Sequence, residues 1–356
     1  MIKEVYNVVG VMSGTSLDGL DLVYVKFQFK KAWSFEIIYS ETISYDSQWV
    51  ETLKGLVTCS LNALKEIDFH YTNYLSLKIK SFINTYNIQY IDAICSHGHT
   101  ALHQPEKGLT YQIGNMSHLA KLLEETVVCD FRVQDVALGG QGAPLVPIGD
   151  KLLFKEYDFC LNLGGFANIS TKIAEERIAY DICPVNIVLN HYVKQLGFDY
   201  DDEGNIAATG TINNELLQNL NNLAFYKKTY PKSLGLEWVD KSIFPLINSF
   251  HLDVKDILAT FVEHIALQLS SEINKKNNVS VLITGGGVYN NFLIESLKTY
   301  TKNDIVIPPA SIIEFKEALI FGFLGVLKLR NEVNCLKSVT GASKNHCSGE
   351  IFNFKK

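Results

Sequence analysis

The stretch Ser13-Gly14-Thr15-Ser16-Leu17-Asp18-Gly19-Leu20-Asp21 decides the fold. It joins two predicted strands, residues 5–12 and 20–29, the second of which alternates apolar and polar side chains. Glycines let a backbone approach an oxyanion, hydroxyls donate to it, and carboxylates hold Mg²⁺. Gly14 and Gly19 have P-loop spacing, but Leu20-Asp21 replaces the Lys-Ser/Thr of a Walker site. The loop therefore predicts a phosphate site of another kind, with an ordinary hairpin turn as the alternative.

Two more glycine loops follow along the chain. Asn162-Leu163-Gly164-Gly165 joins predicted strands 157–164 and 167–173, and Gly285-Gly286-Gly287 ends a predicted strand at 279–284. Glycines between a strand and a helix expose backbone N–H groups to an anion. In this order the loops resemble the first phosphate, second phosphate and adenosine loops of the actin, Hsp70 and sugar-kinase superfamily. That resemblance implies two RNase H-like α/β domains with an ATP cleft between them.

The remaining pattern is also typical of an α/β protein, because strands end in turns and are followed by helices. We expect domain I to contain residues 1–130 and 313–356, and domain II residues 131–312. A strand-glycine-strand hairpin occurs twice, at residues 8–27 and 159–172. Helices are predicted over 47–87, 116–124, 186–196, 254–274 and 314–329, and strands over 90–96 and 126–130, with a polar loop after residue 96.

Composition excludes several classes of function. The 356 residues are 47% apolar and 20% charged, with a net charge of −6, so neither disorder nor affinity for nucleic acid or anionic lipid is expected. No stretch approaches the roughly 18 apolar residues of a membrane span, and no signal-peptide core is recognisable. The 7 cysteines are widely spaced and odd in number, which indicates reduced thiols and a cytoplasmic protein.

At finer grain the chain resembles the anhydro-N-acetylmuramic acid kinase family from residue 10 to about residue 342. The motifs that carry the resemblance are Gly10-Val-Met-Ser-Gly-Thr-Ser-Leu-Asp-Gly-Leu-Asp21, Asp130-Phe-Arg132 with Asp135, Gly139-Gly-Gln-Gly-Ala-Pro-Leu145, Asn162-Leu-Gly-Gly165 with Asn168, Asp202-x-Gly204 with Ala207-Ala208, Pro231-Lys-Ser233 with Gly235 and Glu237, Thr284-Gly-Gly-Gly287 and Lys316-Glu317-Ala318.

The resemblance implies an enzyme of cell-wall recycling that uses ATP and Mg²⁺. Such an enzyme opens the 1,6-anhydro ring of anhydro-N-acetylmuramate with water and phosphorylates O6. The implied partners are therefore an amino sugar and ATP, with a homodimer as a further expectation. Carried over to this chain, Asp181 is the catalytic base and Asp18 the metal ligand. The nucleotide would contact Gly14, Thr15, Ser16, Asp18, Gly19, Asp21, Asn162, Gly164, Gly165, Gly285, Gly286 and Gly287, and the sugar His97, Thr100, Arg132 and Asn186.

The chain departs from the family pattern beside the predicted base. The family commonly has Asp-Thr-Gly-Pro-Gly-Asn where this chain has Asp181-Ile182-Cys183-Pro184-Val185-Asn186. His99 and Leu236 replace a common Gln and Arg. Altered sugar specificity, an inactive family member, or a chaperone-like or regulatory ATPase of the same fold are therefore alternatives.

Several single residues have a second interpretation. Asp181 is a candidate helix-capping residue, and Asp21 a residue that holds its loop. Arg132 binds either a substrate anion or a neighbouring Asp, and Glu317 either lines the active site or complements the N-terminus of its helix. The spacing Cys95-x-His97-x-His99-x-x-x-His103 also raises a zinc site, against which a sugar-lining loop is the preferred interpretation.

Overall fold

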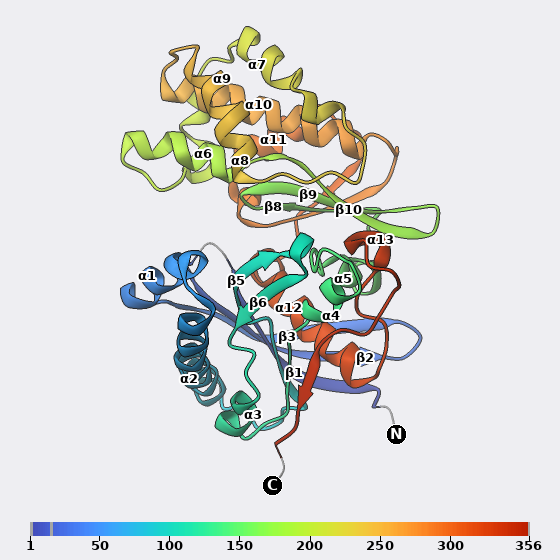
Figure 1. Ribbon diagram of the computed structural model, residues 1–356. Helices are drawn as coiled ribbons and strands as arrows, with labels where there is room; N and C mark the ends of the chain where they lie inside the picture. The colour runs from blue at the N-terminus through green and yellow to red at the C-terminus, as the bar shows by residue number, and fades with distance from the viewer. Residues whose placement is uncertain (1–2, 15–16, 355–356) are drawn as a thin grey trace. The chain divides into compact units, whose positions relative to one another are not determined.

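A computed structural model describes residues 3–14 and 17–354 of the chain (Figure 1). The chain forms two compact units, one of Met1–Phe154 and Phe315–Lys356 and one of Lys155–Glu314. Residues 131–154, which the sequence placed in domain II, thus belong to the first unit. The reason is a set of contacts with the C-terminal segment: the Gln141 N–H donates to the Thr340 carbonyl, and the Thr340 hydroxyl donates to Asp135.

The first unit is built on a six-stranded sheet in the order β13-β7-β4-β1-β2-β3. Strand β2 is antiparallel to both β1 and β3, whereas β4 is parallel to β1 and β7 is parallel to β4. Strand β13 adds an antiparallel edge to β7. The strands of this unit are β1 (Val5–Ser13), β2 (Gly19–Phe29), β3 (Trp33–Ser44), β4 (Ala93–Ser96), β5 (His99–Gln104), β6 (Leu109–Ile113), β7 (Val127–Cys129) and β13 (Glu350–Phe352).

The second unit is built on a five-stranded sheet in the order β10-β9-β8-β11-β12. Strand β9 is antiparallel to β8 and β10, and β11 is parallel to β8 and β12. Its strands are β8 (Phe159–Leu163), β9 (Phe166–Ile173), β10 (Glu176–Pro184), β11 (Ser280–Thr284) and β12 (Asp304–Val306).

If the added edge strand β13 is left aside and strands are numbered within their own sheet, both sheets have the strand order 3-2-1-4-5, with only the second strand antiparallel to its neighbours. This is the RNase H-like topology, and its occurrence twice confirms the predicted α/β fold class. The hairpins β1–β2 and β8–β9, which the sequence singled out as repeated, occupy the same place in the two sheets.

Helices cover the sheets through buried apolar faces. In the first unit, α2 (Leu61–Thr85) packs Leu64, Tyr71 and Leu75 into a cluster with strand residues such as Val9 and Leu22. Helix α12 (Ala310–Leu329), within which the chain passes from the second unit back to the first, lies directly on β1 (Figure 1). A Cβ on Gly10 would lie 2.2 Å from the Ala318 carbonyl oxygen, so only glycine permits this approach.

In the second unit the core lies between the sheet and α10 (Val254–Ile273). The other helices of the first unit are α1 (Ser47–Gly55), α3 (His118–Leu123), α4 (Val133–Ala137), α5 (Pro147–Leu152) and α13 (Lys337–Thr340). Those of the second are α6 (Asn186–Val193), α7 (Asn214–Asn221), α8 (Leu236–Trp238), α9 (Phe244–Asn248) and α11 (Asn291–Thr299). None of the helices in the described ranges is long and apolar enough to cross a membrane.

Sequence periodicity identified the long helices and the buried strands, and missed short helices such as α7 and α11 as well as short or partly exposed strands. The segment expected as a polar loop after residue 96 is a hairpin, β5–β6. Strand β3 was missed because most of its side chains are exposed or half-buried, which weakens the apolar signal.

Candidate active site

The first glycine loop follows β1 in the first unit. Gly14 is half-buried there, while Thr15 and Ser16 lie outside the described residues. Asp18 is exposed, and one of its carboxylate oxygens accepts the Gly19 N–H at 3.0 Å. Gly19 is required by packing, since a Cβ would lie 2.6 Å from the Ile43 carbonyl oxygen on β3. Asp21 accepts the Thr42 hydroxyl at 2.6 Å, a contact that ties β2 to β3.

A hydrogen-bonded chain anchors the end of β1. Ser13 Oγ lies 2.7 Å from His99 Nδ1 and 2.6 Å from the Tyr45 hydroxyl, which lies 2.7 Å from the Tyr71 hydroxyl. Burial lowers the pKa of His99 to about 4, so the ring is neutral at physiological pH. His99, where the family commonly has Gln, thus serves as a neutral hydrogen-bonding group that fixes the start of the loop.

Two predicted sugar-binding residues contact each other. His97 Nδ1 lies 2.9 Å from the Gly98 carbonyl and must carry the ring proton, because a carbonyl only accepts. Nε2 is then the acceptor, and it receives a hydrogen bond from Arg132 Nε at 2.9 Å. Both ring nitrogens are used within the unit, so the geometry favours a positioning role for His97 over direct contact with a sugar hydroxyl.

Arg132 is held by several groups. Its Nη1 donates to the Gly142 carbonyl at 2.6 Å, and its guanidinium lies 6.0 Å from the centre of the Phe321 ring. Burial lowers the pKa of Arg132 to about 10, opposed by the charge of Glu317, so the group stays cationic at neutral pH. The structure thus offers a positioned cation. Thr100, also predicted to bind sugar, lies half-buried on β5 beside an irregularity in the β5–β6 pairing.

In the second unit the other two glycine loops lie against each other. Gly285 has a φ of +86°, and a Cβ there would lie 2.7 Å from Asn162 Oδ1 and 2.8 Å from the Leu163 carbonyl oxygen. The carbonyls of Gly164 and Gly165 accept the N–H groups that begin α6, including that of Asn186. Tertiary folding thus gathers Asn162, Asn186 and five glycines of two distant loops, Gly164, Gly165, Gly285, Gly286 and Gly287.

Asp181 lies near the end of β10, where the register against β9 shifts between Asp181 and Cys183. Its Oδ2 accepts the Leu234 N–H at 2.8 Å, and its own N–H donates to the Lys232 carbonyl at 3.2 Å. Burial raises the pKa of Asp181 above the usual 3.8, offset in part by the Leu234 N–H and by the charge of Lys232. A positioned carboxylate with a raised pKa is suited to accept a proton.

The motif Pro231-Lys-Ser233 contains Lys232 but predicts no role for its side chain. Its ammonium is buried, lies 3.4 Å from Glu272 Oε1, and lies 5.7 Å from the centre of the Tyr180 ring. The structure therefore adds a cation beside Asp181. The signal available in the sequence was the position of Lys232 within Pro231-Lys-Ser233.

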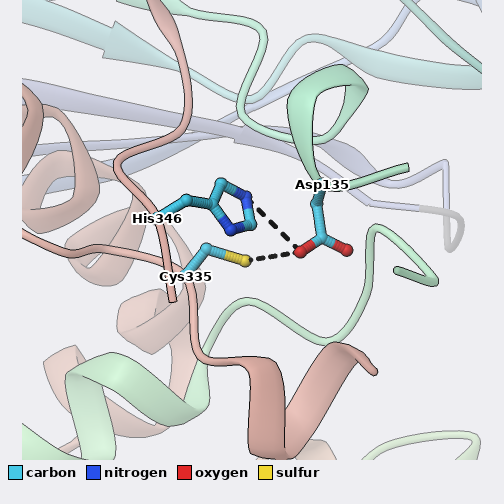
Figure 2. Close-up of side chains that lie close together, drawn as sticks. All are labelled: Asp135, Cys335 and His346. Atoms are coloured by element: carbon cyan, nitrogen blue, oxygen red, sulfur yellow. Dashed lines mark hydrogen bonds and ion pairs between the residues drawn. The ribbon is translucent and has the colours of Figure 1, made fainter. Parts of the chain in front are cut away.

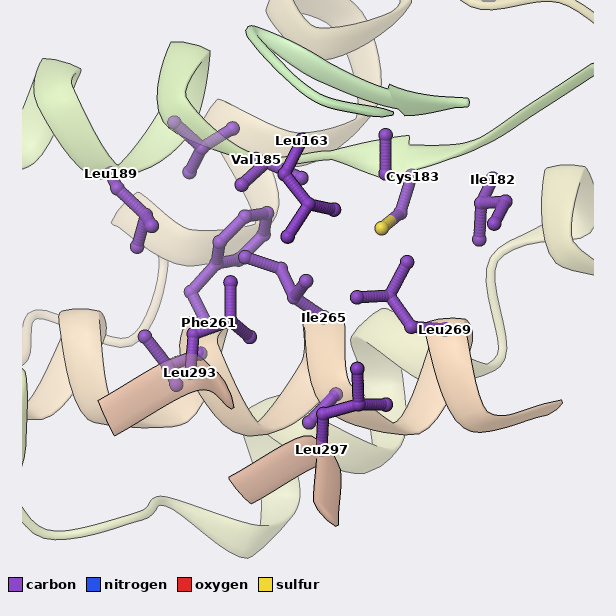
Figure 3. Close-up of a cluster of buried hydrophobic side chains, with 14 of the residues drawn as sticks. Leu163, Ile182, Cys183, Val185, Leu189, Phe261, Ile265, Leu269, Leu293 and Leu297 are labelled. Carbon is purple, nitrogen blue, oxygen red and sulfur yellow. The ribbon is translucent and has the colours of Figure 1, made fainter. Parts of the chain in front are cut away.

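The departures from the family pattern lie in the core (Figure 3). Ile182, Cys183 and Val185 are 1%, 0% and 0% exposed and pack with residues of α10 such as Phe261 and Ile265. Asp181 and Asn186, which the family shares, are half-buried. The three residues that differ from the family pattern thus fill the core, and the side chains of Asp181 and Asn186 lie outside it.

The donor chemistry of the first loop fits Mg²⁺, which prefers oxygen ligands and retains water. The Asp18 carboxylate is the group that would hold it. Asp21 fits less well, because its carboxylate accepts the Thr42 hydroxyl. The Cys and His residues between 95 and 103 form no metal site among the described residues. His97 contacts Arg132, His99 contacts Ser13, and His103 contacts Thr110.

Paired RNase H-like units with glycine loops after equivalent strands define a protein of the actin, Hsp70 and sugar-kinase class. Within that class the chain belongs to the anhydro-N-acetylmuramic acid kinase family, whose model matches residues 6–354.

Proteins named anhydro-N-acetylmuramic acid kinase are similar over nearly their whole length. The one from Sulfurimonas denitrificans is 31% identical, covering 97% of this chain and 98% of its own. The one from Sulfurovum sp. is 33% identical, covering 99% and 100%. A ROK family glucokinase from Streptomyces griseus, solved with glucose and AMPPNP, has a TM-score of 0.42 at 11% identity and covers 89% of this chain and 98% of its own. The fold assignment rests on the strand order.

Proposed function

We propose that this protein is an ATP-dependent kinase that opens the anhydro ring of 1,6-anhydro-N-acetylmuramic acid with water and phosphorylates O6. Its product is N-acetylmuramic acid 6-phosphate. Membership of the kinase family supports the activity, and the observation that carries the mechanism is the Asp181 carboxylate, held by the Leu234 N–H with its pKa raised by burial.

Asp181 acts as the general base. It takes a proton from water, whose oxygen attacks the anomeric carbon, and the bond from that carbon to O6 breaks. The freed O6 attacks the γ-phosphorus of ATP, and ADP leaves. The sum is sugar, water and ATP giving sugar 6-phosphate, ADP and a proton. A base of this kind contributes roughly 10²–10⁴-fold to the rate.

In this proposal the glycine loops bind the phosphates and the adenosine of ATP. The first phosphate loop contains Gly14, Thr15, Ser16 and Gly19. The second contains Asn162, Gly164 and Gly165. Gly285, Gly286 and Gly287 receive the adenosine. The Asp18 carboxylate would hold Mg²⁺, which would supply positive charge to the phosphates. Asp21 holds the loop through Thr42.

Arg132 is the cation for the sugar carboxylate, an assignment supported by its fixed guanidinium. His97 positions Arg132, while Thr100 and Asn186 hydrogen-bond sugar hydroxyls. The compartment we propose is the cytoplasm, and a homodimer stays a prediction.

The test is incubation of the protein with 1,6-anhydro-N-acetylmuramic acid, Mg²⁺ and ATP in ¹⁸O-labelled water, followed by mass spectrometry. The expected product is heavier by one phosphoryl group and one water and carries one ¹⁸O atom on the sugar. A product with phosphate but no added water would show a simple kinase. ATP hydrolysis with unchanged sugar would favour the ATPase alternative.

A further inference from the structure

Three side chains that the proposed reaction does not use meet inside the first unit (Figure 2). Asp135 comes from α4, and Cys335 and His346 come from the C-terminal segment. They are 0%, 1% and 5% exposed, and their potential ligand atoms all lie within 4.8 Å of one another. In the described part of the chain, no other group of three or more such residues gathers in this way.

The distances within this cluster are close to those of a metal site. Asp135 Oδ1 lies 3.0 Å from Cys335 Sγ and 3.4 Å from His346 Nε2. Zinc binds sulfur at about 2.3 Å and nitrogen or oxygen at about 2.0–2.2 Å, which puts tetrahedral ligand atoms about 3.3–3.7 Å apart. Small side-chain shifts would therefore admit the ion.

The orientation of His346 points to a missing positive charge. Its Nδ1 lies 3.2 Å from the Lys344 carbonyl oxygen, so Nδ1 carries a proton. In the neutral ring, the lone pair of Nε2 would then face a carboxylate oxygen, and Nε2 is buried without a hydrogen-bond partner. Two acceptors in contact require a proton or a metal ion between them.

The surroundings also match those of metal ligands. A ligating histidine usually donates its other ring N–H to a carbonyl, and a ligating carboxylate is itself hydrogen-bonded. Here Nδ1 contacts the Lys344 carbonyl, and Asp135 Oδ2 accepts the Gly142 N–H at 2.7 Å. Thiolate, imidazole and carboxylate together favour zinc over magnesium or calcium.

We propose that Asp135, Cys335 and His346 bind one Zn²⁺ ion, with water as the fourth ligand. Binding replaces the Cys335 S–H, which now donates to Asp135, by a sulfur–zinc bond, and the proton leaves to solvent. The ion would cross-link the C-terminal segment to α4. It would also brace the loop that holds Arg132, because the Gly142 carbonyl accepts from Arg132.

The test is a zinc titration of tag-free protein, freed of metal by dialysis against a chelator and carried out without nucleotide. A chromophoric chelator competes for the ion. We expect one Zn²⁺ per chain and a higher melting temperature with zinc. Cys335→Ser and His346→Gln should each weaken binding by about 100-fold or more, because changes around metal ligands alone cost about 10–100-fold. Co²⁺ should give a sulfur-to-cobalt charge-transfer band in the wild type that Cys335→Ser lacks.

Cys347→Ser and Asp18→Asn are matched controls, since Cys347 adjoins His346 without joining the cluster and Asp18 belongs to the predicted magnesium loop. Both should bind zinc like the wild type. Cys335→Ser keeps an O–H donor for Asp135, so its metal-free form should fold, which circular dichroism checks. Absence of zinc binding in the wild type would overturn the proposal in favour of a protonated His346 paired with Asp135. Equal zinc binding by Cys335→Ser and the wild type would overturn it in favour of adventitious surface binding.

Discussion

The two units have one strand order but place different chemistry at the end of the third strand. In the first unit β3 ends at Ser44, and the next residue, Tyr45, joins Ser13 to Tyr71 in a buried hydrogen-bonded chain. In the second unit the corresponding strand, β10, has an irregular register next to Asp181, whose carboxylate is half-buried.

The loops between the first two strands differ as well. The loop after β1 has hydroxyls and a carboxylate, whereas Gly164 and Gly165 make a tight turn after β8 whose carbonyls begin α6. A duplicated framework therefore fixes where the loops emerge from each sheet. In the proposed function, the side chains at those places make the second unit the source of the base, Asp181, and the first unit the source of the metal ligand, Asp18.

Asp181→Asn should have the largest effect. We expect turnover to fall by about 10³-fold or more, because the variant has no base for the attacking water. The melting temperature at pH 7 should stay level or rise, since burial disfavours the charged carboxylate that the variant removes.

The control in the other unit is Asp21→Asn, which keeps an acceptor for the Thr42 hydroxyl and should change turnover less than tenfold. Steady-state kinetics and thermal melts check both variants. Near-normal turnover of Asp181→Asn would contradict the assignment of the base to Asp181, and with it to the second unit.

Gly285→Ala tests the packing of the two glycine loops in the second unit. A φ of +86° and contacts of 2.7–2.9 Å leave no room for a methyl group. Residues held in such a conformation cost about 1–3 kcal/mol, so we expect a lower melting temperature and an ATP KM raised about tenfold.

Gly286→Ala is the matched variant, because the nearest atom to its Cβ would be 4.0 Å away. It should melt like the wild type. Equal behaviour of the two variants would contradict the proposed contact between the loops.

Lys232→Met tests the cation beside Asp181. Removing a positive charge raises the pKa of a neighbouring carboxylate, so the acidic limb of the kcat/KM profile should move to higher pH by about 0.5–1 unit. Lys275→Met is the control, since Lys275 also contacts Glu272 but its side chain is 59% exposed. An unmoved limb, or one moved to lower pH, would show that Lys232 does not act on Asp181.

His99→Gln should have the smallest effect and concerns the first unit alone. A neutral amide can replace the neutral ring beside Ser13, so we expect a stability change within about 1 kcal/mol at pH 7. Because the folded pKa of His99, about 4, lies below the usual 6.5, wild-type stability falls as pH drops from 6.5 to 4.

The variant should lose less stability over that pH interval, as urea denaturation at both ends would measure. A larger loss in His99→Gln than in the wild type would show that the ring does more than hydrogen-bond Ser13.

The sequence predicted the site unevenly. Asp181 and the glycine loops were predictable because their motifs are contiguous and similar to a family. The positioning of Arg132 by His97 was not predictable, because the two residues are 35 positions apart in the chain and no local pattern encodes their contact. The same is true of Lys232 beside Asp181, and of Ile182, Cys183 and Val185, whose burial depends on α10.

By itself the sequence determined the family and, through the resemblance of its motifs, the RNase H-like fold class, and it predicted the roles of the glycine loops and of Asp181 as base, because contiguous motifs carry that information. Only the tertiary structure decided that residues 131–154 belong to the first unit, and that Gly164 and Gly285 lie in neighbouring loops. It alone joined Asp135 to Cys335 and His346. These contacts depend on how distant segments pack around each sheet, and the packing energy is a property of the whole unit rather than of any stretch of chain.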